Sequence, residues 1–323
     1  MTKKFVNLVF GGGGFIGVNL CNALVKRGEY TISIDKSDQL KGYFPKGNLF
    51  NFILANILDD ENLLSNIRRF STEQCFFKVW HLAANSDISQ GVELLDVDLN
   101  DTFLTTVALV NLSKNLNIES VVFASSSAVY GDWKGLRLKE TDGPLRPISN
   151  YGAMKAASEM LLSAGTSSSL KRVLIARFPN VVGSPATHGV IFDFFKKLSA
   201  DPKNLYVLGN GHQQKQYMLS DQLVNILMQL ESSLSKNCTF VNIGPEDDGV
   251  SVKDIANFVA SYHSSDVAIH FEDKDRGWVG DVPVFRFDTS FIKSLTDIKV
   301  YSSKEAIEIA IHAIGSSFKG KSL

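Results

Sequence analysis

The chain has 323 residues, of which 44% are hydrophobic and 21% are charged. These proportions are typical of globular proteins and exclude a disordered chain, a collagen or a disulfide-stapled miniprotein. The 33 basic and 34 acidic side chains give a net charge of −1, so the chain has no basic surplus with which to bind a nucleic acid.

The three cysteines, Cys21, Cys75 and Cys238, lie far apart and form no Cys-x-x-Cys pair. We therefore expect free thiols in a reducing cytosol rather than disulfides or zinc ligands. No apolar stretch approaches the ~18–20 residues that span a bilayer. The apolar run Phe5–Phe10 ends in glycines instead of a signal-peptide cleavage site. These features predict a cytoplasmic protein that does not bind membranes.

Segments typical of strands and of helices alternate from the start of the chain. Apolar runs predict strands at Phe5–Phe10, Thr31–Ile34, Asn51–Ala55, Phe76–Leu82, Ser120–Ala124 and Val173–Ala176. Apolar residues at helical spacing predict helices at Phe15–Arg27, Asp59–Phe70, Leu99–Leu116 and Tyr151–Leu162. Because the strands are apolar without polar alternation, we predict an α/β fold in which helices cover both faces of a parallel, doubly wound Rossmann-type sheet of about seven strands.

The elements after Asn180 are shorter and less regular. Helices are predicted at Val190–Leu198, Asp221–Leu230, Ser251–Tyr262 and Lys304–Ala313, and strands at Leu205–Leu208 and Phe240–Ile243. This pattern predicts a domain of residues 1–180 and a smaller C-terminal α/β domain of residues 181–323, with some of the later chain crossing back to the first sheet.

Glycines recur at three-residue intervals between the first predicted strand and helix, at Gly11, Gly14 and Gly17. Such a turn lets a pyrophosphate approach the backbone and the positive end of a helix. Asp35 follows the second strand, where a carboxylate accepts hydrogen bonds from the adenosine ribose hydroxyls and repels a 2′-phosphate. The pattern predicts a dinucleotide site that prefers NAD over NADP, although the cation of Lys36 stands next to Asp35.

Tyr151 and Lys155 are four residues apart and therefore lie on one face of a predicted helix. A free tyrosine with a pKa of about 10 is a poor base at neutral pH. A nearby ammonium, together with an oxidised nicotinamide, is expected to lower that pKa. The serine run Ser125–Ser127 follows the fifth predicted strand, at the sheet edge where ligands bind. We expect a serine there to bind the same substrate hydroxyl as Tyr151.

These motifs, in this order, make the chain similar to the extended short-chain dehydrogenase/reductases, within the nucleotide-sugar epimerase/dehydratase family that includes UDP-glucose 4-epimerase. Further matching segments are Trp80–Ala84, Arg177–Gly183, Gly209–Gln213 and Arg276–Asp281. The resemblance implies that residues 1–180 bind NAD and that residues 181–323 bind a nucleotide sugar. It also implies a homodimer.

Residue by residue, the resemblance implies that Ser126, Tyr151 and Lys155 are catalytic. Cofactor contacts are implied at Gly11, Gly14, Phe15, Ile16, Gly17, Asp35, Lys36, Asn56, Ile57, Leu82, Ala83, Ala84, Asn100, Ser125, Tyr151, Lys155 and Phe178. Substrate contacts are implied at Ser86, Ser126, Ser127, Asn180, Lys215 and Arg276. Lys215 replaces an arginine that is common in the family, and Asn56 replaces an aspartate. The identity of the nucleotide and of the sugar stays open.

The implied activity is NAD-dependent oxidation at C4 of a nucleotide sugar, most simply 4-epimerisation. A nucleotide-sugar 4-dehydrogenase, which stops at the 4-keto sugar, needs the same first step. A non-catalytic NAD-binding regulator is the alternative of another class, and the intact Ser126, Tyr151 and Lys155 argue against it. Dehydration is not expected because Ser127 and Ala128, which follow Ser126, cannot act as the required acid.

Other polar residues are interpreted as structural. The six histidines have no metal-ligand spacing, so we expect no metal site, and His81 is expected to pack at the end of a strand. Asp87, Asp96 and Asp98 are expected to lie in a solvated loop.

Overall fold

The computed structural model describes residues 4–72, 74–88, 91, 94–235, 237–274, 280 and 282–319. The chain forms two compact units, each assembled from separate stretches of sequence. The first unit comprises Met1–Val129, Asn150–Arg177 and Val224–Val241, and the second comprises Tyr130–Ser149, Phe178–Leu223 and Asn242–Leu323. The functional division at residue 180 stays a prediction.

The first unit contains a seven-stranded sheet in the order β12-β7-β5-β4-β1-β2-β3. Its strands are β1 (Phe5–Phe10), β2 (Thr31–Asp35), β3 (Phe50–Leu54), β4 (Phe76–His81), β5 (Ile118–Ser126), β7 (Val173–Phe178) and β12 (Cys238–Asn242). β1 pairs in parallel with β2 and β4, β2 pairs in parallel with β3, and β4 with β5. The predicted Rossmann-type parallel sheet is confirmed.

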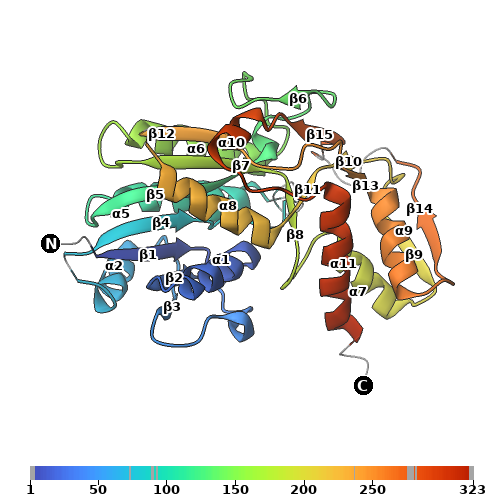
Figure 1. Cartoon of the computed structure of the whole chain (residues 1–323), viewed down its shortest axis with the longest axis horizontal. Helices are drawn as coiled ribbons and strands as arrows, with labels where there is room; N and C mark the ends of the chain where they lie inside the picture. Colours follow the sequence, from blue (N-terminus) through green and yellow to red (C-terminus); the bar gives the residue numbers. More distant parts are fainter. Residues whose placement is uncertain are drawn as a thin grey trace. The chain divides into compact units, whose positions relative to one another are not determined.

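Helices pack on this sheet and explain why its strands are so apolar. The helices of this unit are α1 (Phe15–Lys26), α2 (Asp60–Arg69), α4 (Leu95–Asp98), α5 (Thr105–Leu112), α6 (Asn150–Gly165) and most of α8 (Ser220–Ser233). Helix α5 packs against both α2 and α6 (Figure 1). Strand residues such as Leu8, Val79 and Val121 are fully buried in one apolar core, as expected for a parallel sheet that helices cover.

The helix predicted at Leu99–Leu116 differs from the observed structure. The chain instead forms α4, a π-helical segment at Leu99–Leu104, and then α5, which ends at Leu112. The hydroxyl of Thr105 donates to the backbone oxygen of Thr102 at 2.8 Å, a side-chain bond of the kind that competes with regular helical hydrogen bonds. A wider turn leaves the apolar spacing nearly unchanged, so the sequence pattern did not reveal it.

The second unit is built from short elements around a separate apolar core. Its strands are β6 (Arg137–Leu138), β8 (Asn180–Val182), β9 (Asn204–Val207), β10 (Gln214–Lys215), β11 (Tyr217–Leu219), β13 (Val250–Ser251), β14 (Ala268–Phe271) and β15 (Val284–Phe287). Its helices are α7 (Val190–Ala200), α9 (Val252–His263), α10 (Ser290–Leu295) and α11 (Ser303–Lys319). Phe195, Val259 and Ile311 lie in the core that α7, α9 and α11 share. Strands of two to four residues show no clear periodicity, and most were not predicted.

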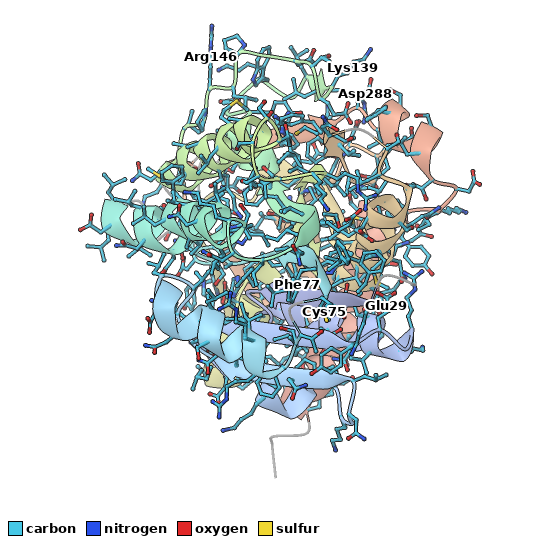
Figure 2. The ribbon with its side chains drawn as sticks, turned by 90° about the vertical axis from the view of Figure 1, so that its left-hand side faces the viewer. Glu29, Cys75, Phe77, Lys139, Arg146 and Asp288 are labelled. Carbon is cyan, nitrogen blue, oxygen red and sulfur yellow. The ribbon has the colours of Figure 1, made fainter. Side chains whose placement is uncertain are left out.

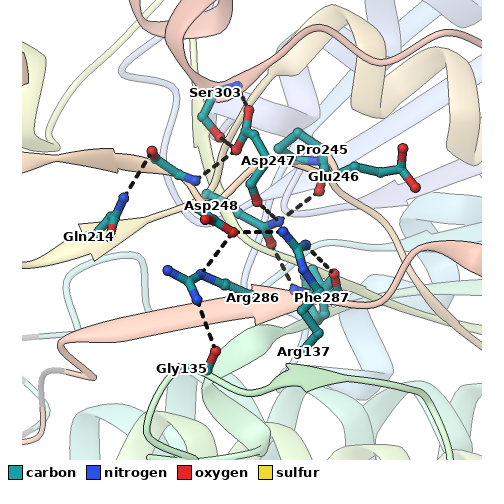
Figure 3. Close-up of polar contacts among 12 residues, drawn as sticks. Gly135, Arg137, Gln214, Pro245, Glu246, Asp247, Asp248, Arg286, Phe287 and Ser303 are labelled. Carbon is teal, nitrogen blue, oxygen red and sulfur yellow. Dashed lines mark hydrogen bonds and ion pairs between the residues drawn. The ribbon is translucent and has the colours of Figure 1, made fainter.

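Charged groups reinforce the four-stranded sheet β13-β10-β15-β6 of the second unit (Figure 3). Asp248 Oδ1 pairs with Arg137 Nη2 at 2.7 Å and with Arg286 Nε at 3.3 Å. Asp247 accepts hydrogen bonds from both the backbone and the hydroxyl of Ser303. The loop that carries these two aspartates is thereby fixed to the sheet and to the start of α11.

The three cysteines are free thiols, as predicted. Cys21 and Cys75 are buried, and burial raises the pKa of Cys21 to about 12, which keeps that thiol protonated. Figure 2 shows Cys75 beside Phe77 at the start of β4. Across the described ranges, we find no helix that is both long and apolar enough to cross a membrane.

Candidate active site

The turn between β1 and α1 can only be made with glycine at two positions. Gly11 has a φ of +79°, and a Cβ atom there would lie 2.6 Å from the backbone nitrogen of Ala83. A Cβ atom at Gly17 would lie 2.2 Å from the backbone oxygen of Gly11. Gly14 precedes α1, whose first turn begins with Phe15 and Ile16 and directs backbone N–H groups toward the turn. This cradle fits a pyrophosphate at a helix N-terminus.

Asp35 is the last residue of β2 and is held by backbone donors. Its Oδ2 accepts from the N–H of Gly13 and its Oδ1 from the N–H of Ser37, both at 3.0 Å. Burial raises the pKa of the Asp35 carboxyl, and these hydrogen bonds oppose the rise. Each oxygen can accept a further hydrogen bond, so the carboxylate is oriented and still able to bind ribose hydroxyls.

Lys36 lies next to Asp35 but is paired elsewhere. Its Nζ is 2.7 Å from Asp101 Oδ1. Because this cation already has a carboxylate partner, it adds little attraction for a 2′-phosphate. The arrangement around Asp35 fits NAD.

The remaining predicted cofactor residues lie mostly at the ends of parallel strands. Leu82–Ala84 follow β4 and are partly buried, whereas Asn56 and Ile57 follow β3, with Asn56 exposed and Ile57 buried. Asn100 is exposed within the π-helical segment. Phe178 ends β7 and is buried. Their contacts with the cofactor stay predictions.

The structure brings Ser126, Tyr151 and Lys155 together. Ser126 ends β5, and its side chain hydrogen-bonds the Tyr151 side chain, which α6 carries in its first turn. Lys155, one turn later on α6, donates from Nζ to the backbone oxygen of Ala124 at 2.6 Å. The same Nζ lies 5.7 Å from the centroid of the Tyr151 ring. A phenol, a hydroxyl and a lysine side chain therefore share one site.

The pKa values at this site differ from the expectation. Burial raises the pKa of Tyr151, the Ser126 hydrogen bond opposes the rise, and the charge of Asp98 adds to it. Burial lowers the pKa of Lys155 to about 7, against the influence of Glu159. In the protein by itself the expected lowering of the Tyr151 pKa is therefore absent, because burial outweighs the hydrogen bond with Ser126. The sequence analysis expected the positive charge of an oxidised nicotinamide to lower the Tyr151 pKa as well, and that charge is still needed.

The prediction that Asp98 lies in a solvated loop is wrong. The residue was expected in a solvated loop with Asp87 and Asp96, which are exposed, but Asp98 is only 1% exposed. Its Oδ1 accepts from Asn85 Nδ2 at 2.8 Å, and burial raises the pKa of its carboxyl. The partner comes from the loop after β4, so the sequence around Asp98 gave no sign of it.

His81 packs at the end of β4, as predicted. Its side chain is fully buried, and Nε2 lies 3.0 Å from the Thr106 hydroxyl. Burial lowers the pKa of His81 to about 3, so the imidazole is neutral. Among the described residues we find no group of three or more His, Cys, Asp or Glu side chains that could hold a metal ion.

The predicted substrate residues are spread over both units. Ser86 is exposed after β4, and Ser127 begins the short 3-10 turn that follows β5. Asn180 is exposed at the start of β8, and Lys215 is partly buried in β10. Arg276 lies outside the described residues. Their contacts with a nucleotide sugar stay predictions.

The parallel sheet, the glycine turn with Asp35 and the Ser126–Tyr151–Lys155 cluster are features of a Rossmann-type protein with a dinucleotide site. A family model described as the NAD dependent epimerase/dehydratase family matches residues 7–244. The chain belongs to this family, as the sequence motifs predicted, and is an enzyme of it. Its cofactor is NAD, which the glycine cradle and Asp35 fit.

Individual relatives are similar over most of the chain. The uncharacterized UDP-glucose epimerase YtcB of Bacillus subtilis is 27% identical over 285 residues, which cover 84% of this chain and 86% of the relative. A crystal structure of UDP-galactose 4-epimerase is 27% identical, covers 97% of this chain and 99% of its own, and has a TM-score of 0.82. The structure of TunA, an NAD-dependent NDP-hexosamine 5,6-dehydratase, is 25% identical, covers 97% and 98%, and has a TM-score of 0.79.

Proposed function

We propose that this enzyme is a nucleotide-sugar 4-epimerase that uses NAD and takes Tyr151 as its base. The observation that carries the proposal is the cluster of Ser126, Tyr151 and Lys155 at the carboxyl end of β5, in the unit that contains the glycine turn. Similar proteins support the substrate class, because they include an uncharacterized UDP-glucose epimerase and a UDP-galactose 4-epimerase.

In the proposed reaction, Ser126 and Tyr151 bind the O4 hydroxyl of the sugar, and Tyr151 removes its proton as a phenolate. NAD, held by the Gly11–Gly17 turn and Asp35, would supply the redox chemistry as a reversible hydride acceptor for C4. Lys155 stabilises the phenolate of Tyr151 when the lysine is protonated. Ser126 and Tyr151 hold the carbonyl oxygen while the sugar turns, and Tyr151 then gives the proton back to O4 of the epimer.

Epimerisation is favoured over dehydration by the residues beside the base. Loss of water from C5–C6 needs an acid for the leaving hydroxyl. Ser127 and Ala128 provide no such acid. The carboxyl group of Asp98 is buried and accepts a hydrogen bond from Asn85. A 4-dehydrogenase shares the oxidation step and differs only in releasing the keto sugar.

A panel of UDP-, dTDP- and GDP-sugars, incubated with purified protein and NAD, tests the proposal. Mass spectrometry and proton NMR of the products, with NADH absorbance, separate the outcomes. A C4 epimer of unchanged mass supports the proposal. Stoichiometric NADH with a free keto sugar indicates the dehydrogenase, a product lighter by one water indicates a dehydratase, and NAD binding without turnover of any sugar indicates the regulator.

A further inference from the structure

Two side chains of α6 form hydrogen bonds with two consecutive residues at the end of β5, Ala124 and Ser125. Lys155 Nζ donates to the backbone oxygen of Ala124 at 2.6 Å, and the Ser125 hydroxyl donates to Glu159 Oε1 at 2.5 Å. The next residue of the strand is Ser126, whose side chain meets that of Tyr151. Tyr151, Lys155 and Glu159 follow one another at four-residue intervals, so one stripe of the helix makes all three contacts.

Glu159 is itself held rigidly by Arg177 of β7. Arg177 Nε donates to Oε1 at 2.8 Å and Nη2 donates to Oε2 at 2.6 Å, a two-pronged pair. Glu159 is 0% and Arg177 3% exposed, and the guanidinium lies 5.2 Å from the ring centroid of Phe240. A buried ion pair is tolerated only when its geometry is complete. The carboxylate is therefore a fixed acceptor for Ser125.

A second serine that donates to the carboxylate of a buried ion pair lies near the start of β5. The Ser120 hydroxyl donates to Glu231 Oε1 at 2.7 Å, and Glu231 Oε2 pairs with Lys78 Nζ at 2.6 Å. Ser120 and Glu231 are buried like their counterparts. Ser120 lies six residues before Ser126 on the same strand and serves as a matched control.

We propose that Ser125, Glu159 and Arg177 form a positioning cluster that holds the Ser126 hydroxyl against Tyr151. The proposal rests on the proposed role of Tyr151 as the base and gives these three residues a role in the same reaction. None of the three has to touch the sugar. Loosening the cluster lets the end of β5 shift, so that Tyr151 loses the hydrogen bond that favours its phenolate.

The test replaces serine by alanine, which leaves every charge in place. Ser125→Ala, Ser120→Ala and Tyr151→Phe are compared with the wild type as full-length, NAD-loaded proteins. The phenolate titration of Tyr151 is followed by ultraviolet difference absorbance, with Tyr151→Phe identifying its signal. We expect Ser125→Ala to raise the Tyr151 pKa and to lower kcat about tenfold, with the sugar KM unchanged. Ser120→Ala should lower the unfolding temperature similarly but leave the titration and kcat at wild-type values.

Two further variants make the result decisive. Adding Ser125→Ala to Ser126→Ala should cost no further activity, because the cluster acts through Ser126. Arg177→Lys, which keeps the charge but not the two-pronged geometry, should also lower kcat and raise the Tyr151 pKa. Wild-type titration and kcat in Ser125→Ala or Arg177→Lys, or additive losses in the double variant, would overturn the positioning role alone. Full activity of Tyr151→Phe would instead overturn the proposed function and this inference with it.

Discussion

Replacing Asp35 by alanine is expected to weaken NAD binding ~100-fold. Each carboxylate oxygen already accepts one backbone N–H, from Gly13 or Ser37, and has room for one ribose hydroxyl. A hydrogen bond to a charged group contributes ~1.5–3 kcal/mol. Two such bonds at the lower end give ~3 kcal/mol, and each ~1.4 kcal/mol is a factor of ten in affinity.

The same variant should narrow the preference for NAD over NADP, because the negative charge that repels a 2′-phosphate is removed while Lys36 stays paired with Asp101. Calorimetric titration with both cofactors measures the two affinities, and thermal unfolding without cofactor separates binding from stability. Asp38→Ala is the control, since the Asp38 side chain is 45% exposed and pairs with Lys41 at 3.3 Å. Unchanged affinities for both cofactors in Asp35→Ala would refute the assignment of Asp35 as the ribose ligand.

Three other predictions follow from the site. Tyr151→Phe should bind NAD normally and lose at least ~10²-fold in the rate of sugar oxidation, the low end of general-base contributions; steady-state kinetics with near wild-type rates would contradict this. Asp98→Asn should move the acid limb of the pH–rate profile to lower pH by ~0.5–1 unit, because the Asp98 charge raises the Tyr151 pKa and its loss favours the phenolate. The exposed Asp96→Asn is its control, and a shift to higher pH would count against the reasoning. Light scattering should show a homodimer at micromolar concentration rather than a monomer, formed through the π-helical segment, α5 and α6. Apolar residues of these elements that remain partly or fully exposed include Phe103, Val107, Val110, Met160 and Leu161.

Features that depend on neighbours along the chain could be predicted from the sequence. Gly11 and Gly17 predict a tight strand–helix turn, and the structure has no room for a Cβ atom at either position. Tyr151 and Lys155 share a helix face because of their four-residue spacing. The apolar strands were sufficient to predict the parallel sheet. A strand that is buried on both faces consists almost entirely of apolar residues, and this is visible in the sequence.

Features that depend on partners from distant elements could not be predicted. Asp98 is buried because Asn85, in another loop, donates to it. Glu159 stands one turn after Lys155 on the same face, but only the adjacent β7 provides Arg177 as its partner. The sign of the pKa shift at Tyr151 was also missed, because it depends on how deeply α6 buries the side chain.

A nucleotide sugar that carries deuterium at C4 tests most directly whether the hydride leaves and returns at C4 while only the O4 proton is exchanged with Tyr151. The substrate is the one identified from the panel, and the reaction is run in ordinary water with catalytic protein and NAD. We expect a C4 epimer of unchanged mass that retains the deuterium, because a label transferred as hydride to bound NAD would return to the same sugar. Loss of the label to solvent, or a product lighter by one water, would contradict it.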